Sequence, residues 1–123
     1  MARYHFGNSV EPLGDYAWYD KNAYALGEAY AHPVAQKKPN AWGLYDMHGN
    51  VWEWVEDCWH DNYHGAPDNG DAWTVECGGT AHVLRGGSWN LDAFSLRAAN
   101  RSNYSPHHHS GFRVVRALSP ATR

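Results

Sequence analysis

The stretch Asn40-Ala-Trp-Gly-Leu-Tyr-Asp-Met-His-Gly-Asn-Val-Trp-Glu-Trp54 is the most informative part of this 123-residue chain. Apolar residues at spacings of three and four make residues 45–57 the best helical candidate in the sequence. The dipeptide Gly49-Asn50 interrupts that pattern, because it favours a turn. We therefore expect a turn at residues 46–50 and a short strand or helical turn over residues 51–55.

Outside this stretch the sequence shows no repeat, no low-complexity segment and no linker, so residues 1–123 are expected to form a single domain. Alternation of apolar and polar residues predicts four further strands, at residues 81–84, 87–89, 96–99 and 111–116. Residues 65–79 are rich in Gly, Asp, Asn and Pro and are predicted to be a loop.

Aromatic residues dominate the composition, with seven Trp and eight Tyr beside twelve Gly. A chain of this size buries only about two thirds of its unfolded surface, so large rings on glycine turns are expected to build the core.

The charge pattern and the hydropathy limit the classes of partner. Ten Lys and Arg are scattered among thirteen Asp and Glu, with a net charge of −3 and no basic stripe for nucleic acid. No uncharged stretch approaches the roughly 20 apolar residues of a membrane span, and the N-terminal residues lack a secretory pattern. We expect a soluble protein that binds neither nucleic acid nor membrane. Its cellular location is not predicted.

Three further motifs follow the first in order: Arg85-Gly-Gly-Ser-Trp89, Arg97-Ala-Ala-Asn-Arg101 and Gly111-Phe-Arg-Val-Val115. Together the four motifs resemble the formylglycine-generating enzyme or sulfatase-modifying factor family. That family also includes domains of sulfoxide synthases and the variable proteins of diversity-generating retroelements.

The resemblance implies an α+β, C-type-lectin-like fold with little regular secondary structure and one small twisted antiparallel sheet. It runs from about Arg3 to Arg116 and covers the C-terminal half of the family domain. The fold is therefore expected in truncated form. Because half of the family core is missing, self-association over an apolar face is also expected.

Two carboxylates flank the Gly49-Asn50 turn, and such oxygen donors suit Ca²⁺. The resemblance implies that the side chains of Asp46 and Glu53 bind calcium. It also implies two backbone carbonyl ligands, from Gly49 and Val51. The alternative is that Asp46 caps the turn while Glu53 pairs with an arginine such as Arg85 or Arg101.

The family's oxidases use two cysteines as copper ligands between the second and third motifs, because thiolates bind copper(I) well. Here that segment, residues 89–96, contains no cysteine. We therefore expect neither copper binding nor oxidation of a peptidyl cysteine to formylglycine.

Cys58 and Cys77 are the only cysteines of the chain. A disulfide between them and two buried free thiols are equally compatible with the sequence. A zinc site that also uses His60 and His64 is disfavoured, because the spacing fits no compact zinc finger.

Residues between the motifs resemble a binding surface of mixed aromatic and polar character. Each of them can be reached from the asparagine codon AAC by changing adenines alone, as diversity-generating retroelements do, although ordinary loop composition explains them equally well. The candidate ligand-binding residues are Leu91, Asp92, Phe94, Ser95, Ser102, Asn103, Tyr104, His107, His108 and His109.

The sequence thus favours a non-catalytic module that binds a protein or a small molecule through these loops. The alternative is a fragment or subunit of a formylglycine-generating or sulfoxide-synthase-type oxidase whose catalytic parts lie outside this chain. The sequence does not identify the ligand.

Overall fold

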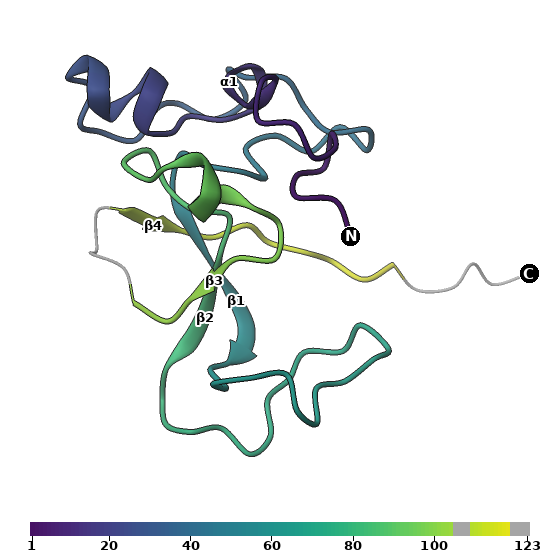
Figure 1. Cartoon of the computed structure of the whole chain (residues 1–123). Coiled ribbons are helices and arrows are strands. Elements are labelled where there is room, and N and C mark those ends of the chain that lie inside the picture. Colours follow the sequence, from purple (N-terminus) through teal and green to yellow (C-terminus); the bar gives the residue numbers. More distant parts are fainter. Residues whose placement is uncertain (105–108, 119–123) are drawn as a thin grey trace, which may run out of the picture.

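Regular secondary structure is sparse in the computed structural model, which describes residues 1–104 and 109–118. The helical elements are α1 (Leu13–Tyr16) and the 3-10 turns η1 (Asp20–Asn22), η2 (Tyr24–Leu26) and η3 (Ala93–Leu96). The strands are β1 (Trp52–Cys58), β2 (His82–Arg85), β3 (Arg101–Ser102) and β4 (Ser110–Gly111). The helical turns lie at one end of the sheet and the loop between β1 and β2 lies at the other (Figure 1). None of the described helices is long and apolar enough to span a bilayer.

The four strands form one sheet in the order β3-β2-β1-β4. β2 runs antiparallel to both β1 and β3, whereas β4 runs parallel to β1. The sheet is therefore mixed, which corrects the expectation of a purely antiparallel one. Glu53 pairs with Arg85 and Trp54 with Leu84 before the β1–β2 register becomes irregular towards Cys58.

The turn predicted at residues 46–50 is present, with positive φ at Asp46, Gly49 and Asn50. The strand that follows is longer than predicted and ends at Cys58. The predictions for residues 81–84 and for the loop at residues 65–79 agree with the observed structure.

Two predicted strands are absent because their sequences turn instead. Residues 87–89 begin at Gly87, and the φ angles of Gly86 and Gly87, 95° and 77°, bend the chain away from β2. In the other segment Leu96 closes η3, and Asp92 caps this 3-10 turn by accepting a hydrogen bond from the Ser95 amide.

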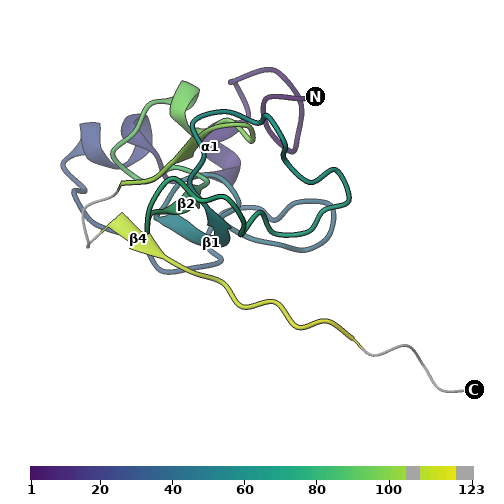
Figure 2. The ribbon, with the colours of Figure 1, turned by 90° about the horizontal axis from the view of Figure 1, so that it is seen from below.

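The strand predicted at residues 111–116 is mostly missing, since β4 ends at Gly111. The backbone of residues 112–118 runs away from the body of the protein (Figure 2). The apolar side chains of Phe112, Val114, Val115 and Leu118 are exposed. Alternation favours an extended chain, but a strand also needs a neighbour to receive its backbone hydrogen bonds. No described segment pairs with residues 112–118.

The core is aromatic only in part, because its largest fully buried side chains are Leu13, Leu84 and Leu96. One cluster of buried residues packs the N-terminal segment against η3; it comprises Tyr4, Leu13, Ala17, Tyr19 and Leu96. Around the sheet, Trp52, Trp73 and Trp89 are buried together with Val83 and Leu84.

Candidate functional site

Asn50 connects three distant segments from a buried position, with 3% of its surface exposed. Its side chain accepts a hydrogen bond from the His32 amide (2.8 Å) and donates one to the His32 carbonyl (3.0 Å). Its backbone N–H donates to the Trp18 carbonyl and its carbonyl accepts from the Trp89 amide. The turn of the first motif is therefore the joint on which the N-terminal segment and the second motif are assembled.

His48 lies in the same turn and is also buried. Its Nδ1 is 2.6 Å from the Leu96 carbonyl oxygen, and its Nε2 is 3.1 Å from the backbone N–H of His5. A carbonyl only accepts and an amide only donates, so this geometry requires the neutral ring with its hydrogen on Nδ1. Burial lowers the pKa of His48 in agreement with that assignment.

Acidification should therefore destabilise the protein through His48. Since its folded-state pKa lies below the ordinary value of 6.5, its contribution is complete above pH 6.5 and is lost as the pH falls below that value. We expect the urea midpoint to fall between pH 8 and pH 5, and to fall less in His48→Gln.

His5 stacks on His48, and burial lowers its pKa too, so it contributes in the same direction. An exposed histidine, His82, provides the control: His82→Gln should keep the wild-type pH dependence. An unchanged pH dependence in His48→Gln would contradict this assignment.

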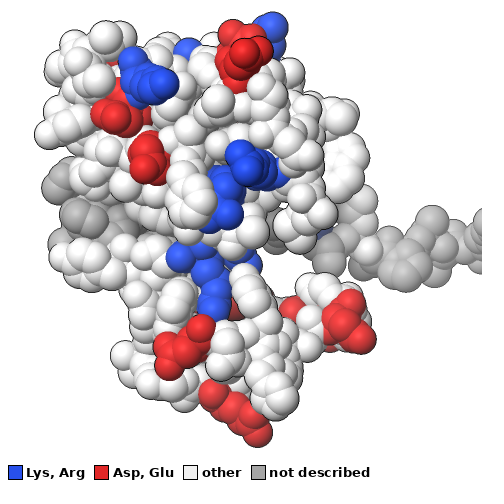
Figure 3. Space-filling model, in the orientation of Figure 1, with Lys and Arg blue, Asp and Glu red and all other residues white. Residues whose placement is uncertain are grey.

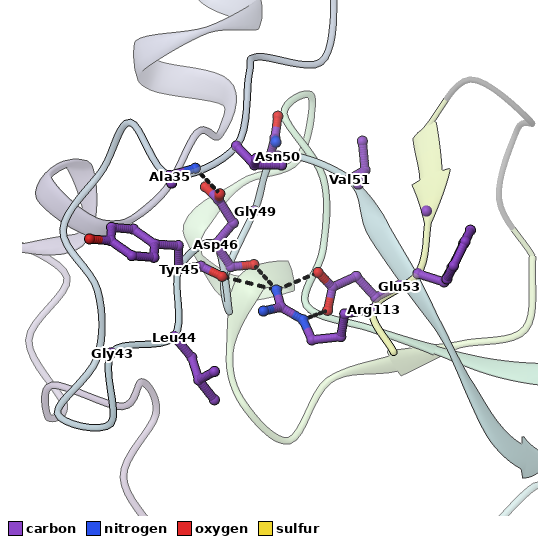
Figure 4. Close-up of a pocket in the computed structure, with 13 residues that line it drawn as sticks. Ala35, Gly43, Leu44, Tyr45, Asp46, Gly49, Asn50, Val51, Glu53 and Arg113 are labelled. Atoms are coloured by element: carbon purple, nitrogen blue, oxygen red, sulfur yellow. Dashed lines mark hydrogen bonds and ion pairs between the residues drawn. The ribbon is translucent and has the colours of Figure 1, made fainter. Parts of the chain in front are cut away.

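The predicted calcium ligands Asp46, Gly49, Val51 and Glu53 all line one open hollow of about 570 Å³ (Figure 4). Arg113 enters this hollow and donates hydrogen bonds from both Nε and Nη2 to the Glu53 carboxylate. Its Nη2 also lies 2.9 Å from the Tyr45 carbonyl oxygen and 3.2 Å from that of Asp46. Hydrogen bonding to Glu53 raises the pKa of Arg113, so the guanidinium is charged.

The arginine that pairs with Glu53 is thus Arg113, rather than Arg85 or Arg101. The Asp46 carboxylate points away from this pair, and its Oδ2 accepts a hydrogen bond from the Ala35 amide at 3.0 Å (Figure 4). Its Oδ1 is buried and has no hydrogen-bond partner among the described residues. The donors suit a hard cation in kind, but calcium would reach Glu53 only if Arg113 released it.

The candidate ligand-binding residues divide into exposed and inward-facing groups. Phe94 and Tyr104 are 67% and 76% exposed, and Asn103 is exposed beside Tyr104. The Ser102 hydroxyl bonds to the backbone of Tyr104, while the Asp92 cap fixes Ser95 in η3. The exposed part of the predicted surface is therefore held by local hydrogen bonds.

Two of the predicted residues face inwards. Leu91 packs against the core cluster, and His109 is only 7% exposed and stands edge-on to the Trp89 ring. The expectation of an exposed loop is therefore wrong at His109, because its imidazole ring packs in a buried contact against Trp89. His107 and His108 lie outside the described residues.

Cys58 and Cys77 form a disulfide, with Cα atoms 5.7 Å apart. Both sulfurs of the disfavoured zinc set are therefore used by this bond. His60 stacks on Trp73, with ring centroids 3.4 Å apart, and its nitrogens face the backbone carbonyls of Cys58 and Val75. His60 is thus part of the packing of the loop.

Comparison with known proteins agrees with these motifs and this architecture. The sequence profile described as the sulfatase-modifying factor enzyme 1-like domain matches residues 1–118. The formylglycine-generating enzyme of Thermomonospora curvata is 33% identical over 132 residues, which cover 94% of this chain and 43% of that enzyme.

Solved structures resemble the same part of the fold. Treponema denticola variable protein 1 superimposes with a TM-score of 0.68 and 34% identity, over 91% of this chain and 40% of the other. PvdO from Pseudomonas aeruginosa gives a TM-score of 0.67 and 41% identity, over 80% of this chain and 38% of that chain. The chain thus spans about two fifths of the length of these relatives. The likeness confirms the predicted C-type-lectin-like α+β fold in truncated form.

Proposed function

The chain belongs to the sulfatase-modifying factor enzyme 1-like domain family, and from this membership we propose that it is a non-catalytic binding module. Its ligand, a protein or a small molecule, binds at the surface formed by η3 and residues 102–104. The observation that carries the proposal is that the chain has no pair of free thiols where the resembled oxidases hold copper. The only two cysteines are bonded to each other, and neither lies between the second and third motifs.

An oxidase of the resembled type needs two free thiolates close together, because these hold copper(I) beside the substrate thiol. Cys58 ends β1 and Cys77 lies in the loop that precedes β2. The segment that would supply the ligands presents Leu91 to the core and Phe94 to solvent instead. This arrangement supports a role in binding rather than in oxidation.

Phe94 and Tyr104 are the anchors that we assign to the ligand. Exposed aromatic side chains supply large contact area for little loss of conformational entropy, and they dominate the energetics of many interfaces. Asp92 and Ser102 lie two residues before Phe94 and Tyr104, and each fixes the local backbone by accepting a hydrogen bond. Exposed aromatic side chains with polar neighbours are typical of recognition surfaces.

The decisive experiment compares the chain with a Phe94→Ala/Tyr104→Ala double variant. A protein captured from the source cells by the immobilised chain would be purified, and its affinity for both forms measured by calorimetry. We expect the double variant to bind about 100-fold more weakly, with a melting temperature within a few degrees of the wild type.

Trp42→Ala is the matched control, because Trp42 is 86% exposed but lies outside the proposed surface. Equal weakening by Trp42→Ala would contradict the assignment of the surface. Copper-dependent turnover of a cysteine-containing sulfatase peptide by the purified chain would refute the non-catalytic reading.

A second candidate is a subunit or piece of a larger oxidase. Two observations favour it: the apolar residues Phe112, Val114, Val115 and Leu118 are exposed, and the chain spans 43% of the enzyme from Thermomonospora curvata. Exposed apolar segments of this kind are covered by further chain or by self-association. The intact mass of the protein from its native source distinguishes this candidate, which requires a longer chain or a bound partner.

We also propose calcium as a ligand of Asp46, Gly49, Val51 and Glu53, supported by their common hollow and by the unpartnered Asp46 Oδ1. An ion that binds only the folded state stabilises it by about 2.7 kcal/mol at 100 times its Kd. Calcium should therefore raise the melting temperature by several degrees relative to chelator, and Glu53→Gln should abolish the rise. Glu56→Gln, an exposed change on the same strand, should preserve it. Equal melting temperatures with calcium and with chelator would exclude the site.

A further inference from the structure

Four arginines that are scattered in the sequence come together on one face of the fold. The backbone carbonyl of Arg3 accepts a hydrogen bond from the Ala98 amide at 2.7 Å, which places Arg3 beside the third motif. Arg97 and Arg101 bound that motif, and Arg85 stands directly opposite Arg101 in the β2–β3 pair. We call Arg3, Arg85, Arg97 and Arg101 the arginine run.

Figure 3 shows basic side chains gathered in the middle of this face, with acidic groups above and below them, one of which adjoins the lowest basic side chain. The sequence predicted no such stripe, because the count of charges does not reveal which arginines the strands bring together. Within residues 1–104 and 109–118, none of the four arginines forms an ion pair with a carboxylate. The run therefore carries positive charge that the fold itself does not neutralise.

This arrangement costs stability, since like charges directly opposite each other in a sheet repel. Aromatic contacts offset the cost. The Arg101 guanidinium lies over the rings of Trp59 and Tyr63, at 4.3 and 4.6 Å from their centroids. The Arg97 guanidinium lies 3.6 Å from the centre of the Phe94 ring. The flat faces of these cations are thus covered by rings, which restricts their orientation.

The arginines differ in how many of their guanidinium N–H groups donate hydrogen bonds within the protein. Arg85 donates hydrogen bonds from Nη1 to the carbonyls of Ala99 and Asn100. Its Nη2 donates to the Tyr63 hydroxyl. The Arg101 side chain, by contrast, makes no hydrogen bond to any described residue, so its donors are open. A guanidinium held by its faces with free donors along its edge is arranged to bind an oxyanion through two parallel hydrogen bonds.

We propose that the arginine run binds the carboxylates of an acidic segment of a partner protein, at the edge of the binding surface. This inference rests on the proposed function and gives its ligand a chemical class. Phe94 adjoins the run directly, and interfaces between proteins are enriched in arginine and aromatic residues together. A nucleic acid is a poorer fit, because the chain has a net charge of −3 and the arginine run alone would provide few phosphate contacts.

The test measures fluorescence anisotropy of labelled hexaglutamate with the full chain at low salt, with labelled hexaglutamine as the uncharged control. Hexaglutamate should bind and hexaglutamine should not. Arg97→Gln/Arg101→Gln should weaken hexaglutamate binding at least 10-fold. Arg116→Gln, an exposed arginine on the C-terminal segment, should change it less than twofold.

A second variant guards against misfolding. Arg101→Lys keeps the charge but loses the planar pair of donors, and it should weaken binding several-fold with an unchanged circular dichroism spectrum. Three results would overturn the proposal: no binding of hexaglutamate, equal loss in Arg116→Gln, or stronger competition by a thymidine oligonucleotide of equal charge.

Failure of this inference is separable from failure of the proposed function. If Phe94→Ala/Tyr104→Ala loses the purified partner while the arginine variants keep both partner and hexaglutamate, the arginine run is not the acidic-segment site, although the binding surface stands. If the arginine variants lose hexaglutamate while the aromatic variant keeps the partner, the aromatic anchors are wrong and the run stands.

Discussion

Replacing Gly49 by alanine should destabilise the protein by more than about 4 kcal/mol, a large part of the 5–15 kcal/mol that holds a domain folded. Gly49 has a φ of +78°, and an added Cβ would lie 2.2 Å from the Trp18 carbonyl oxygen and 3.1 Å from Leu96 Cδ2. The carbonyl cannot retreat easily, because it accepts the backbone hydrogen bond of Asn50 at 2.8 Å. Trp18 is also stacked on His32.

Gly70→Ala separates the two causes of this effect. Gly70 has a similar φ of +85°, but an added Cβ would meet nothing within 4 Å. It should therefore cost only the roughly 1–2 kcal/mol of a left-handed backbone in a residue with a side chain. Urea unfolding of both variants provides the measurement. A Gly49→Ala loss no greater than that of Gly70→Ala would mean that the turn opens without strain.

The fold could be predicted where short sequence signals coincide with the structural cause. Gly49-Asn50 indicated a turn, and the backbone there has the positive φ that favours Gly and Asn. The same reasoning failed at residues 111–116. Alternation of apolar and polar residues is a property of one segment, whereas a strand also needs a neighbouring segment to pair with. It failed at residues 87–89 because the local glycines outweigh the β-propensity of the residues beside them.

The candidate site was predictable in part for the same reason. Asp46 and Glu53, which the sequence singled out together, line one hollow, since both lie within eight residues of the chain. It did not identify Arg113 as the partner of Glu53, because that contact joins residues 60 positions apart. The Gly-Phe-Arg motif contains this arginine, but nothing in the sequence favoured Arg113 over Arg85 or Arg101. The arginine run was missed because it depends on the pairing of β2 with β3.

Loss of the disulfide between Cys58 and Cys77 is the second large effect that we expect. The bond closes a loop with a sequence separation of 19, for which chain entropy predicts about 3 kcal/mol of stabilisation. A reducing agent should lower the urea midpoint of the wild type accordingly. Cys58→Ala/Cys77→Ala should show the lowered midpoint without any reducing agent, and it should not respond when one is added.

The disulfide should also influence binding, because the loop that it closes carries Trp59 and Tyr63, whose rings hold Arg101. Opening the loop frees these rings to move, so the Arg101 guanidinium loses its orientation while its charge is unchanged. Hexaglutamate binding should therefore weaken several-fold on reduction at a urea-free condition where the chain is still folded by circular dichroism. Binding in Cys58→Ala/Cys77→Ala should be equally weak with and without reductant. An unchanged affinity after reduction would show that β3 alone orients Arg101 and that the loop contributes stability only.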